Sequence, residues 1–195
     1  MKNLVFYGDG LLCPPEGYGE AVIELLVTRR PGALFKSFHS GEEQLALEGA
    51  LRGAPALIGK APDIVVVGLG AVDLLQGADP DLACERLGAL VNLLLLKTQA
   101  RVALTTVCSS FLPAEARPAA AGFNAGLRGL AASAGDRVVV LDVDAAVAGF
   151  LDAHRRGGGE KRSLHAQPLR LTSTGRVFLS NTVYALLDLD AHFPE

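Results

Sequence analysis

The chain has 195 residues, 50% of them hydrophobic and 20% charged, with a formal net charge of -3 and a pI near 5.8. This length suits a single domain, residues 1–195, that buries about 70% of its unfolded surface, and the apolar content excludes a disordered protein. The acidic balance excludes a general electrostatic attraction to nucleic acid or to an anionic membrane.

The cysteines and the apolar runs indicate a cytoplasmic protein. Cys13, Cys84 and Cys108 are widely spaced and odd in number, so they predict neither a disulfide framework nor a zinc site. The longest apolar stretch, residues 87–96, is too short to span a membrane, and residues 1–7 are too short for a signal-peptide core. We expect no metal and no cofactor.

Five apolar or β-branched runs predict strands, and three of them are almost continuously apolar, which is typical of strands covered on both faces. The runs are LVFY (4–7), ALFKSF (33–38), DIVVVGL (63–69), RVALTTV (101–107) and RVVVLDV (137–143). Segments with helical spacing lie between and after them, at residues 18–29, 42–58, 81–98, 115–134, 145–154 and 175–187. This alternation predicts a five-stranded parallel sheet between two layers of helices, a three-layer α/β/α sandwich.

The loops after the strands are the expected place for a functional site, because ligands of such sheets bind outside the carboxyl ends of the strands. These loops are GDG (8–10), FHSGEE (38–43), GLGAVD (68–73), VCSSFLP (107–113) and DVDA (142–145), with a sixth, HRRGGGEKRSLHAQPLR (154–170), before the last helix. In DVDA, Asp144 is expected to cap the following helix. The basic residues of the sixth loop predict either a gate for an anionic ligand or a solvated loop.

Taken in order, the loops resemble the sequence blocks of the SGNH (GDSL-type) hydrolases, a family of esterases, lipases, thioesterases and carbohydrate deacetylases. FYGDG with the later GYG resembles the first block, SFHSGEE the second, PDIVVVGLGAVDLL the third and QPLRLTSTGRVFL the last. FNAGLRGLAA and RVVVLDVDAAV are similar to the helix and strand between them. The resemblance covers almost the whole chain and implies a flavodoxin-like fold of the SGNH-hydrolase type.

The resemblance also implies where the catalytic groups of the family would stand. Carried over by position, Gly10 replaces the serine, Val72 the asparagine, Gln167 the aspartate and Arg170 the histidine. Ester hydrolysis by the family's triad needs a hydroxyl nucleophile, a base and a carboxylate that orients the base. We therefore expect none of these four positions to be catalytic, and we expect a non-catalytic pseudo-hydrolase.

Residues at and beside these positions predict a ligand site, which is formed by Asp9, Gly10, Gly41, Asp73 and Arg170. A glycine between a strand and a helix lets the backbone approach a ligand closely, and a guanidinium suits a carboxylate or a phosphate. The expected partner is a small molecule, anionic in one version of the hypothesis, or another protein. In the alternative interpretation, Arg170 pairs with Asp9 or Asp73 and fills an inactive site.

An esterase that acts through relocated groups is the competing hypothesis. Cys108, Ser109 and Ser110 follow the fourth strand, His165 lies in the last loop, and His39 lies beside the second block. A Ser–His or Cys–His pair among these residues would rebuild a nucleophile and its base.

Overall fold

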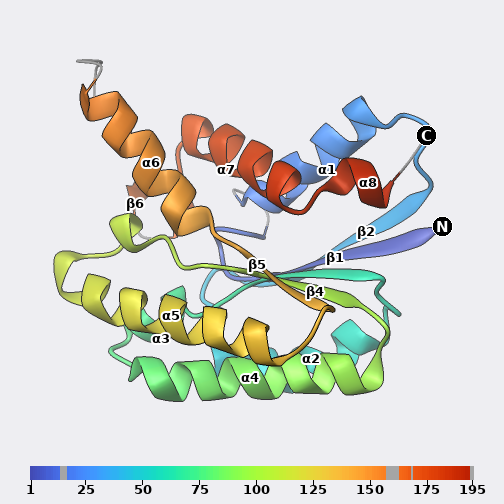
Figure 1. The fold of residues 1–195 in the computed structure, drawn as a ribbon, viewed down its shortest axis with the longest axis horizontal. Coiled ribbons are helices and arrows are strands. Elements are labelled where there is room, and N and C mark those ends of the chain that lie inside the picture. The colour runs from blue at the N-terminus through green and yellow to red at the C-terminus, as the bar shows by residue number, and fades with distance from the viewer. Residues whose placement is uncertain (14–16, 157–162, 168, 194–195) are drawn as a thin grey trace.

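The computed structural model describes residues 1–13, 17–156, 163–167 and 169–193, built around a five-stranded parallel sheet (Figure 1). The strands are β1 (Lys2–Gly8), β2 (Phe35–Gly41), β3 (Ile64–Gly68), β4 (Arg101–Thr105) and β5 (Val138–Leu141). They lie in the order β2-β1-β3-β4-β5, and every pairing between neighbours is parallel. This is the flavodoxin-like order, so the predicted α/β fold is confirmed.

Helices cover both faces of the sheet. The helices of one layer are α1 (Tyr18–Arg29), α6 (Val143–Arg156), α7 (Ser173–Leu186) and α8 (Leu189–His192), and those of the other are α2 (Leu47–Ile58), α3 (Ala71–Leu75), α4 (Pro80–Lys97) and α5 (Arg117–Ser133). Figure 1 shows the two layers above and below the sheet. The architecture is the expected three-layer sandwich.

The alternation of side chains along β1 explains why both faces need a helical layer. Leu4 and Phe6 pack in the core under α1 and α7, whereas Val5 and Tyr7 pack in the core beside α2 and α4. All four side chains are buried. Successive residues of a strand point to opposite faces, so an uninterrupted apolar run is buried only when both faces are covered.

The structure corrects two predicted boundaries around β2. The strand begins at Phe35 and continues to Gly41, so most of FHSGEE, predicted as a loop, is strand. Its polar residues conceal it in the sequence, because β2 is an edge strand with mostly half-buried side chains. Helix α2 begins at Leu47 rather than at residue 42, and residues 42–46 connect the two elements.

The short elements were not predicted, because two to five residues are too few to show a period. They are α3, α8, the 3-10 turns η1 (Ser109–Phe111) and η2 (Ala114–Ala116), and a two-stranded antiparallel sheet of β6 (His165–Gln167) and β7 (Arg170–Leu171). This small sheet lies in the predicted last loop and extends one residue beyond it, to Leu171. Residues 157–162 of that loop, with its glycine run and two of its basic residues, lie outside the described residues.

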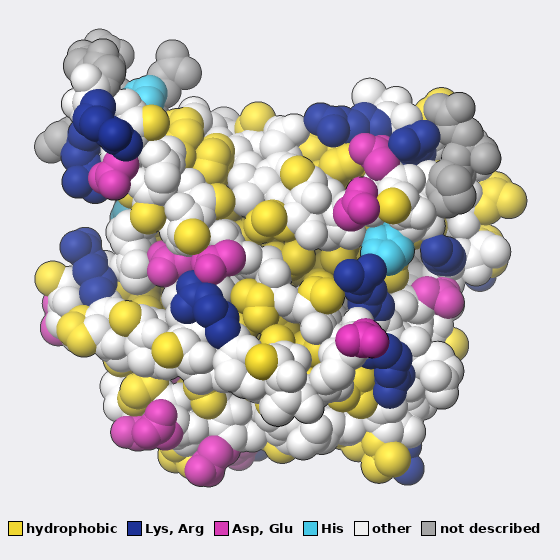
Figure 2. Space-filling model, viewed as in Figure 1, with side chains coloured by type: hydrophobic (Ala, Val, Ile, Leu, Met, Phe, Trp, Pro, Cys, Tyr) yellow, Lys and Arg dark blue, Asp and Glu magenta, His cyan; other side chains and the backbone are white. Residues whose placement is uncertain are grey.

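The surface is mixed in charge. Figure 2 shows acidic and basic side chains interspersed over the face that it presents, as the small net charge leads one to expect. Across residues 1–13, 17–156, 163–167 and 169–193, no helix combines the length and the apolar character needed to cross a membrane.

Candidate functional site

Three glycines end neighbouring strands at the same level of the sheet. Gly8 of β1 pairs with Gly41 of β2 and with Gly68 of β3. A β-carbon on Gly41 would collide with the carbonyl oxygen of Gly8, and one on Gly8 would collide with that of Gly68. The close approach of the strand ends therefore requires glycine at residue 41, whether or not a ligand binds there.

Leu12 fills the space that the glycines leave open above the strand ends. Its side chain is fully buried, and its Cδ2 atom would lie 3.1 Å from a β-carbon placed on Gly68. The turn that follows β1 thus folds back over the sheet. An apolar side chain stands where the strands of this fold would otherwise expose their carboxyl ends.

Gly10, at the position of the family's serine, lies against the segment that follows β2. Its N–H donates to the carbonyl oxygen of Glu43 at 3.3 Å. A β-carbon on Gly10 would lie 3.1 Å from Glu43 Cγ and 3.3 Å from the carbonyl oxygen of Leu169. The space that the first atom of a serine side chain would need is already crowded from both sides.

Arg170 forms an ion pair with the same glutamate. Its Nε donates to Glu43 Oε1 at 3.1 Å, and both side chains are about half exposed (47% and 53%). Glu43 therefore contacts Gly10 through its backbone and Arg170 through its carboxylate. Gln167 is exposed and pairs with Arg170 across the small sheet.

Asp9 is a buried carboxyl group, only 3% exposed. Its Oδ1 accepts a hydrogen bond from the N–H of Leu11 at 3.0 Å. Burial raises the pKa of Asp9 to about 7, and the negative charge of Asp73 adds to this, while the N–H of Leu11 opposes it. The group therefore exchanges its proton near neutral pH.

Asp73 has a structural task. It is 4% exposed, and its Oδ2 accepts from the N–H of Leu47, the first residue of α2, at 3.0 Å. Ala46, the N-cap residue of α2, has no side-chain acceptor, so Asp73 supplies the missing cap from a distant segment. Burial raises the pKa of Asp73, and the hydrogen bond from Leu47 opposes that rise.

Val72 lies in the core. It is 1% exposed on α3 and packs in the cluster that contains α2, α4 and α5. This packing makes Val72 a core residue. Its side chain has no donor for an oxyanion.

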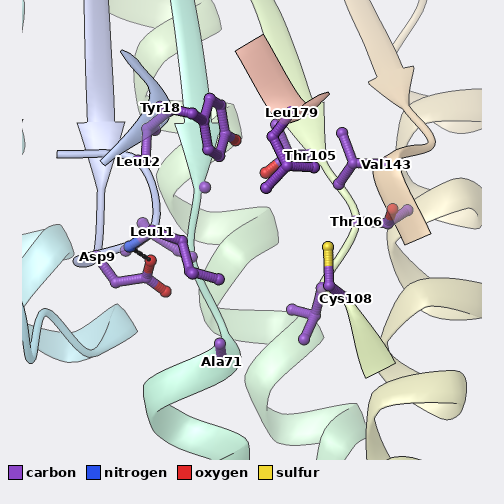
Figure 3. A pocket seen from close by; sticks show the side chains of 13 residues that line it. Asp9, Leu11, Leu12, Tyr18, Ala71, Thr105, Thr106, Cys108, Val143 and Leu179 are labelled. Atoms are coloured by element: carbon purple, nitrogen blue, oxygen red, sulfur yellow. Dashed lines mark hydrogen bonds between the residues drawn. The ribbon is translucent and has the colours of Figure 1, made fainter. Parts of the chain in front are cut away.

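A cavity of about 20 Å³ lies at the ends of β1, β3 and β4. Figure 3 shows Asp9, Tyr18, Thr105 and Cys108 among the side chains around it, with Leu11 and Leu12 on the β1 side. A space of this size holds about one water molecule. It has no room for the acyl or alcohol portion of an ester.

The candidates for a relocated nucleophile after β4 are mostly engaged elsewhere. Ser109 donates from Oγ to Asp144 Oδ1 at 2.9 Å, and its N–H donates to the same oxygen at 2.8 Å. Cys108 is buried, and burial raises the pKa of its thiol, which keeps it in the weakly nucleophilic neutral form.

Ser110 and His165 are both neighbours of Phe111, Ser110 along the chain and His165 in space. The ring centroid of His165 is 4.8 Å from that of Phe111. Ser110 Oγ and His165 Nδ1 are both buried without a hydrogen-bond partner in the described part of the chain, so they are not bonded to each other. His39 stacks on Phe6, 5.2 Å between centroids, and is not part of this group.

A buried polar network behind these residues was not predicted. Asn124 of α5 accepts from Val107 N–H at 2.8 Å and donates to Val107 O at 2.9 Å and to Asp144 Oδ2 at 3.3 Å. The sequence indicated that Asn124 is buried, since it falls at helical spacing with the buried Leu127.

The expected capping of α6 by Asp144 is wrong. Asp142 Oδ1 accepts from Ala145 N–H at the start of α6, whereas Asp144 Oδ1 accepts from Ser109 N–H in the loop after β4.

Within the described part of the chain, the arrangement offers neither a metal site nor a bonded nucleophile–base pair. Among the residues that the structure describes, no three His, Cys, Asp or Glu side chains come together as metal ligands. The hydroxyl and thiol groups considered above donate to carboxylates, are buried as neutral groups or stand without a base. At its surface, the site presents the ion pair between Glu43 and Arg170.

The fold is similar to that of several solved structures, two of which are acetylxylan esterases. The chain superposes on TesA with a TM-score of 0.74 at 19% identity, covering 96% of this chain and 99% of TesA. It superposes on the acetyl xylan esterase AlAXEase (TM-score 0.78, 18% identity, 94% and 98% covered) and on Axe2, an acetylxylan esterase from Geobacillus stearothermophilus (0.80, 16%, 95% and 94%).

A member of the lipolytic protein G-D-S-L family from Veillonella parvula is similar too, with a TM-score of 0.73 at 16% identity and 95% and 98% of the chains covered. No family model matches the sequence, and no curated protein matches it in sequence. The likeness at these low identities is one of fold. It confirms the SGNH-hydrolase type of architecture that the order of the loops implies.

Proposed function

We propose that this protein is a pseudo-hydrolase, which uses the hydrolase-like fold to bind a small molecule or a protein partner and does not cleave esters. The observation that carries the proposal is the surroundings of Gly10. The residue has no nucleophile, and Glu43 and Leu169 crowd the position from which a serine would project.

The neighbouring positions support the same conclusion. Hydrolysis by the triad requires a base within hydrogen-bond reach of the nucleophile and donors aimed at the oxyanion. Arg170 is a permanent cation that cannot accept a proton at neutral pH, and Val72 offers no donor. The cavity of about 20 Å³ beside Asp9 is itself too small to hold a substrate.

Binding at this position would use the exposed part of the site. Asp9 and Asp73 are buried and hydrogen-bonded to backbone N–H groups, and Gly41 packs against Gly8. A small anion would therefore contact Arg170, near Gly10, by taking the place of the Glu43 carboxylate. Both side chains of that ion pair are half exposed, so the exchange needs no rearrangement of the core.

The first test is an assay with p-nitrophenyl acetate and p-nitrophenyl hexanoate on the purified wild type and on Gly10→Ser. We expect both proteins to match a heat-denatured control. Hydrolysis by the wild type that is lost in Ser110→Ala or His165→Asn would overturn the proposal in favour of the relocated esterase.

The second test measures thermal unfolding with small carboxylates and phosphates. We expect a stabilising anion to lose its effect in Arg170→Gln and to keep it in Arg52→Gln, a matched control on α2 whose guanidinium also pairs with a glutamate, Glu48. The same thermal shift in both variants would contradict an anion site at Arg170 and leave a protein partner as the ligand of the proposal.

A further inference from the structure

A second hollow, larger than the one at the strand ends, lies between α6 and α7. It has a volume of about 760 Å³ and is lined by Phe150 of α6 and by one face of α7, which includes Ser173, Val177, Phe178 and Thr182. We call it the α6–α7 groove. Sites for small molecules commonly measure 300–1,000 Å³ and are mostly apolar with a few polar groups.

Aromatic and aliphatic side chains form the floor of the groove. The ring centroids of Phe150 and Phe178 are 4.7 Å apart, and His154 stacks on Phe150 at 5.3 Å. Val177 is 60% exposed although it is apolar. Figure 2 shows apolar side chains along the seam between these two helices.

One end of the groove is polar and cationic. Ser173 also lines a neighbouring hollow of about 170 Å³, whose other walls are Leu171, Thr172 and Arg176. Within the described residues, Arg176 forms no salt bridge. Figure 2 shows further basic side chains at the far end of α6.

We propose that the α6–α7 groove binds a long-chain fatty acid, with its hydrocarbon chain along Phe150, Val177 and Phe178 and its carboxylate at Arg176 and Ser173. The charge at one end of an apolar slot is complementary to a ligand with one anionic end and an apolar remainder. An amphipathic helix of a partner protein is the occupant that is left if the titration below contradicts fatty acid binding.

The proposal rests on the proposed function only in treating the protein as a binder. The groove is separate from Gly10 and Arg170, and its proposed role is tested by measuring binding rather than hydrolysis. Detection of esterase activity would therefore defeat the proposed function without touching the groove, and failure of fatty acid binding would leave the absence of hydrolysis unaffected.

The experiment is a fluorescence titration. The chain contains no tryptophan, so Thr182→Trp places a single reporter at the groove. Carboxylates of eight to fourteen carbons are added below their micelle concentrations. We expect affinity to rise with length by up to about four-fold per methylene, which is the value for complete burial, and dodecanol to bind at least five-fold more weakly than dodecanoate. Affinity independent of chain length would overturn the proposal.

Variants then locate the ligand, with calorimetry in place of the reporter. Val177→Asp should weaken dodecanoate binding at least ten-fold, and its exposed position lets the fold stay intact. Arg176→Gln should weaken dodecanoate but not dodecanol. Leu96→Asp, at a 77% exposed position on α4 in the opposite layer, is the matched control and should change neither. Equal losses in Val177→Asp and Leu96→Asp would contradict the site.

Discussion

Asp9 has a property that the sequence did not predict. It occupies a turn beside the inactive serine position, where the sequence suggested a ligand-binding role. Instead, its carboxyl group is buried and has a pKa of about 7. An acid whose pKa is raised by folding destabilises the folded state whenever it is ionised.

Replacing Asp9 by asparagine should therefore stabilise the protein at high pH. Between pH 3.8 and about pH 7 the folded protein holds a proton that the unfolded chain has released, so the free energy of unfolding decreases as the pH rises through this window. Asp9→Asn should exceed the wild type by on the order of 1–4 kcal/mol at pH 8, and the two should converge near pH 4.

Urea unfolding at pH 4.5 and pH 8 measures this difference. Asp152→Asn, at a position more than half exposed on α6, serves as the control and should follow the wild type at both values. Equal stability of Asp9→Asn and wild type at pH 8 would show that the carboxyl group is not held against ionisation.

The positions of the candidate site were predictable from the sequence, but the contacts of their side chains were not. The order of the loops identified Gly10, Val72, Gln167 and Arg170 as one set of positions. It did not show that Arg170 pairs with Glu43, since the residues are 127 positions apart and the choice among acidic partners depends on how the small sheet is placed.

The loop after β4 and helices α5 and α6 are joined by one buried asparagine. Asn124→Ala should cost about 2–4 kcal/mol in free energy of unfolding, because both backbone polar groups of Val107 lose their partner in a dry environment. Asn181→Ala, an exposed position on α7, should change stability by less than about 0.5 kcal/mol. Chemical denaturation compares the two, and similar values for both would refute the structural role of Asn124.

The ion pair between the small sheet and the segment after β2 should contribute little. A double-mutant cycle of Glu43→Ala and Arg170→Ala should give a coupling of about 0.2–1 kcal/mol, decreasing at 0.5 M salt, because both side chains are half exposed. Thermal or urea unfolding of the four proteins gives this value. A coupling above about 2 kcal/mol would mean that the pair holds the site closed more firmly than its exposure indicates.

Elements with a period were predicted well, and elements defined by contacts were not. Helix α1 was predicted at its observed bounds, and the apolar cores of β3 and β4 appear at the expected places. Strand β2 was shifted because its polar edge-strand residues break the apolar run, and α2 was extended because its cap, Asp73, comes from another part of the chain. Capping across such a distance leaves no local signal.

The molecule as a whole combines buried groups that respond to pH in opposite directions. Burial lowers the pKa of His39, His165 and His192, and for His192 the charges of Arg101 and Lys2 add to this. Arg101 donates to His192 Nε2 at 2.8 Å, so that nitrogen carries no proton. A base with a lowered pKa contributes stability that is lost as the pH falls below its unfolded value of about 6.5.

Asp9 and the histidines therefore oppose each other between pH 7 and pH 5. We expect the Asp9→Asn variant, which lacks the compensating acid, to lose stability more steeply than the wild type as the pH falls through this range. Adding His192→Gln should flatten the slope. Urea unfolding at intervals of half a pH unit tests both statements, and identical slopes for wild type and Asp9→Asn would contradict them.

The reactivity of Cys13 would measure how often the turn that covers the strand ends opens. Cys13 is 3% exposed, burial raises the pKa of its thiol to about 11, and a β-carbon on Gly41 would lie 2.9 Å from its sulfur. A thiol reagent can modify Cys13 only while this turn is lifted. With Cys84 and Cys108 replaced, the labelling rate would report how often, in seconds or hours, the carboxyl ends of the strands become accessible to any visiting molecule.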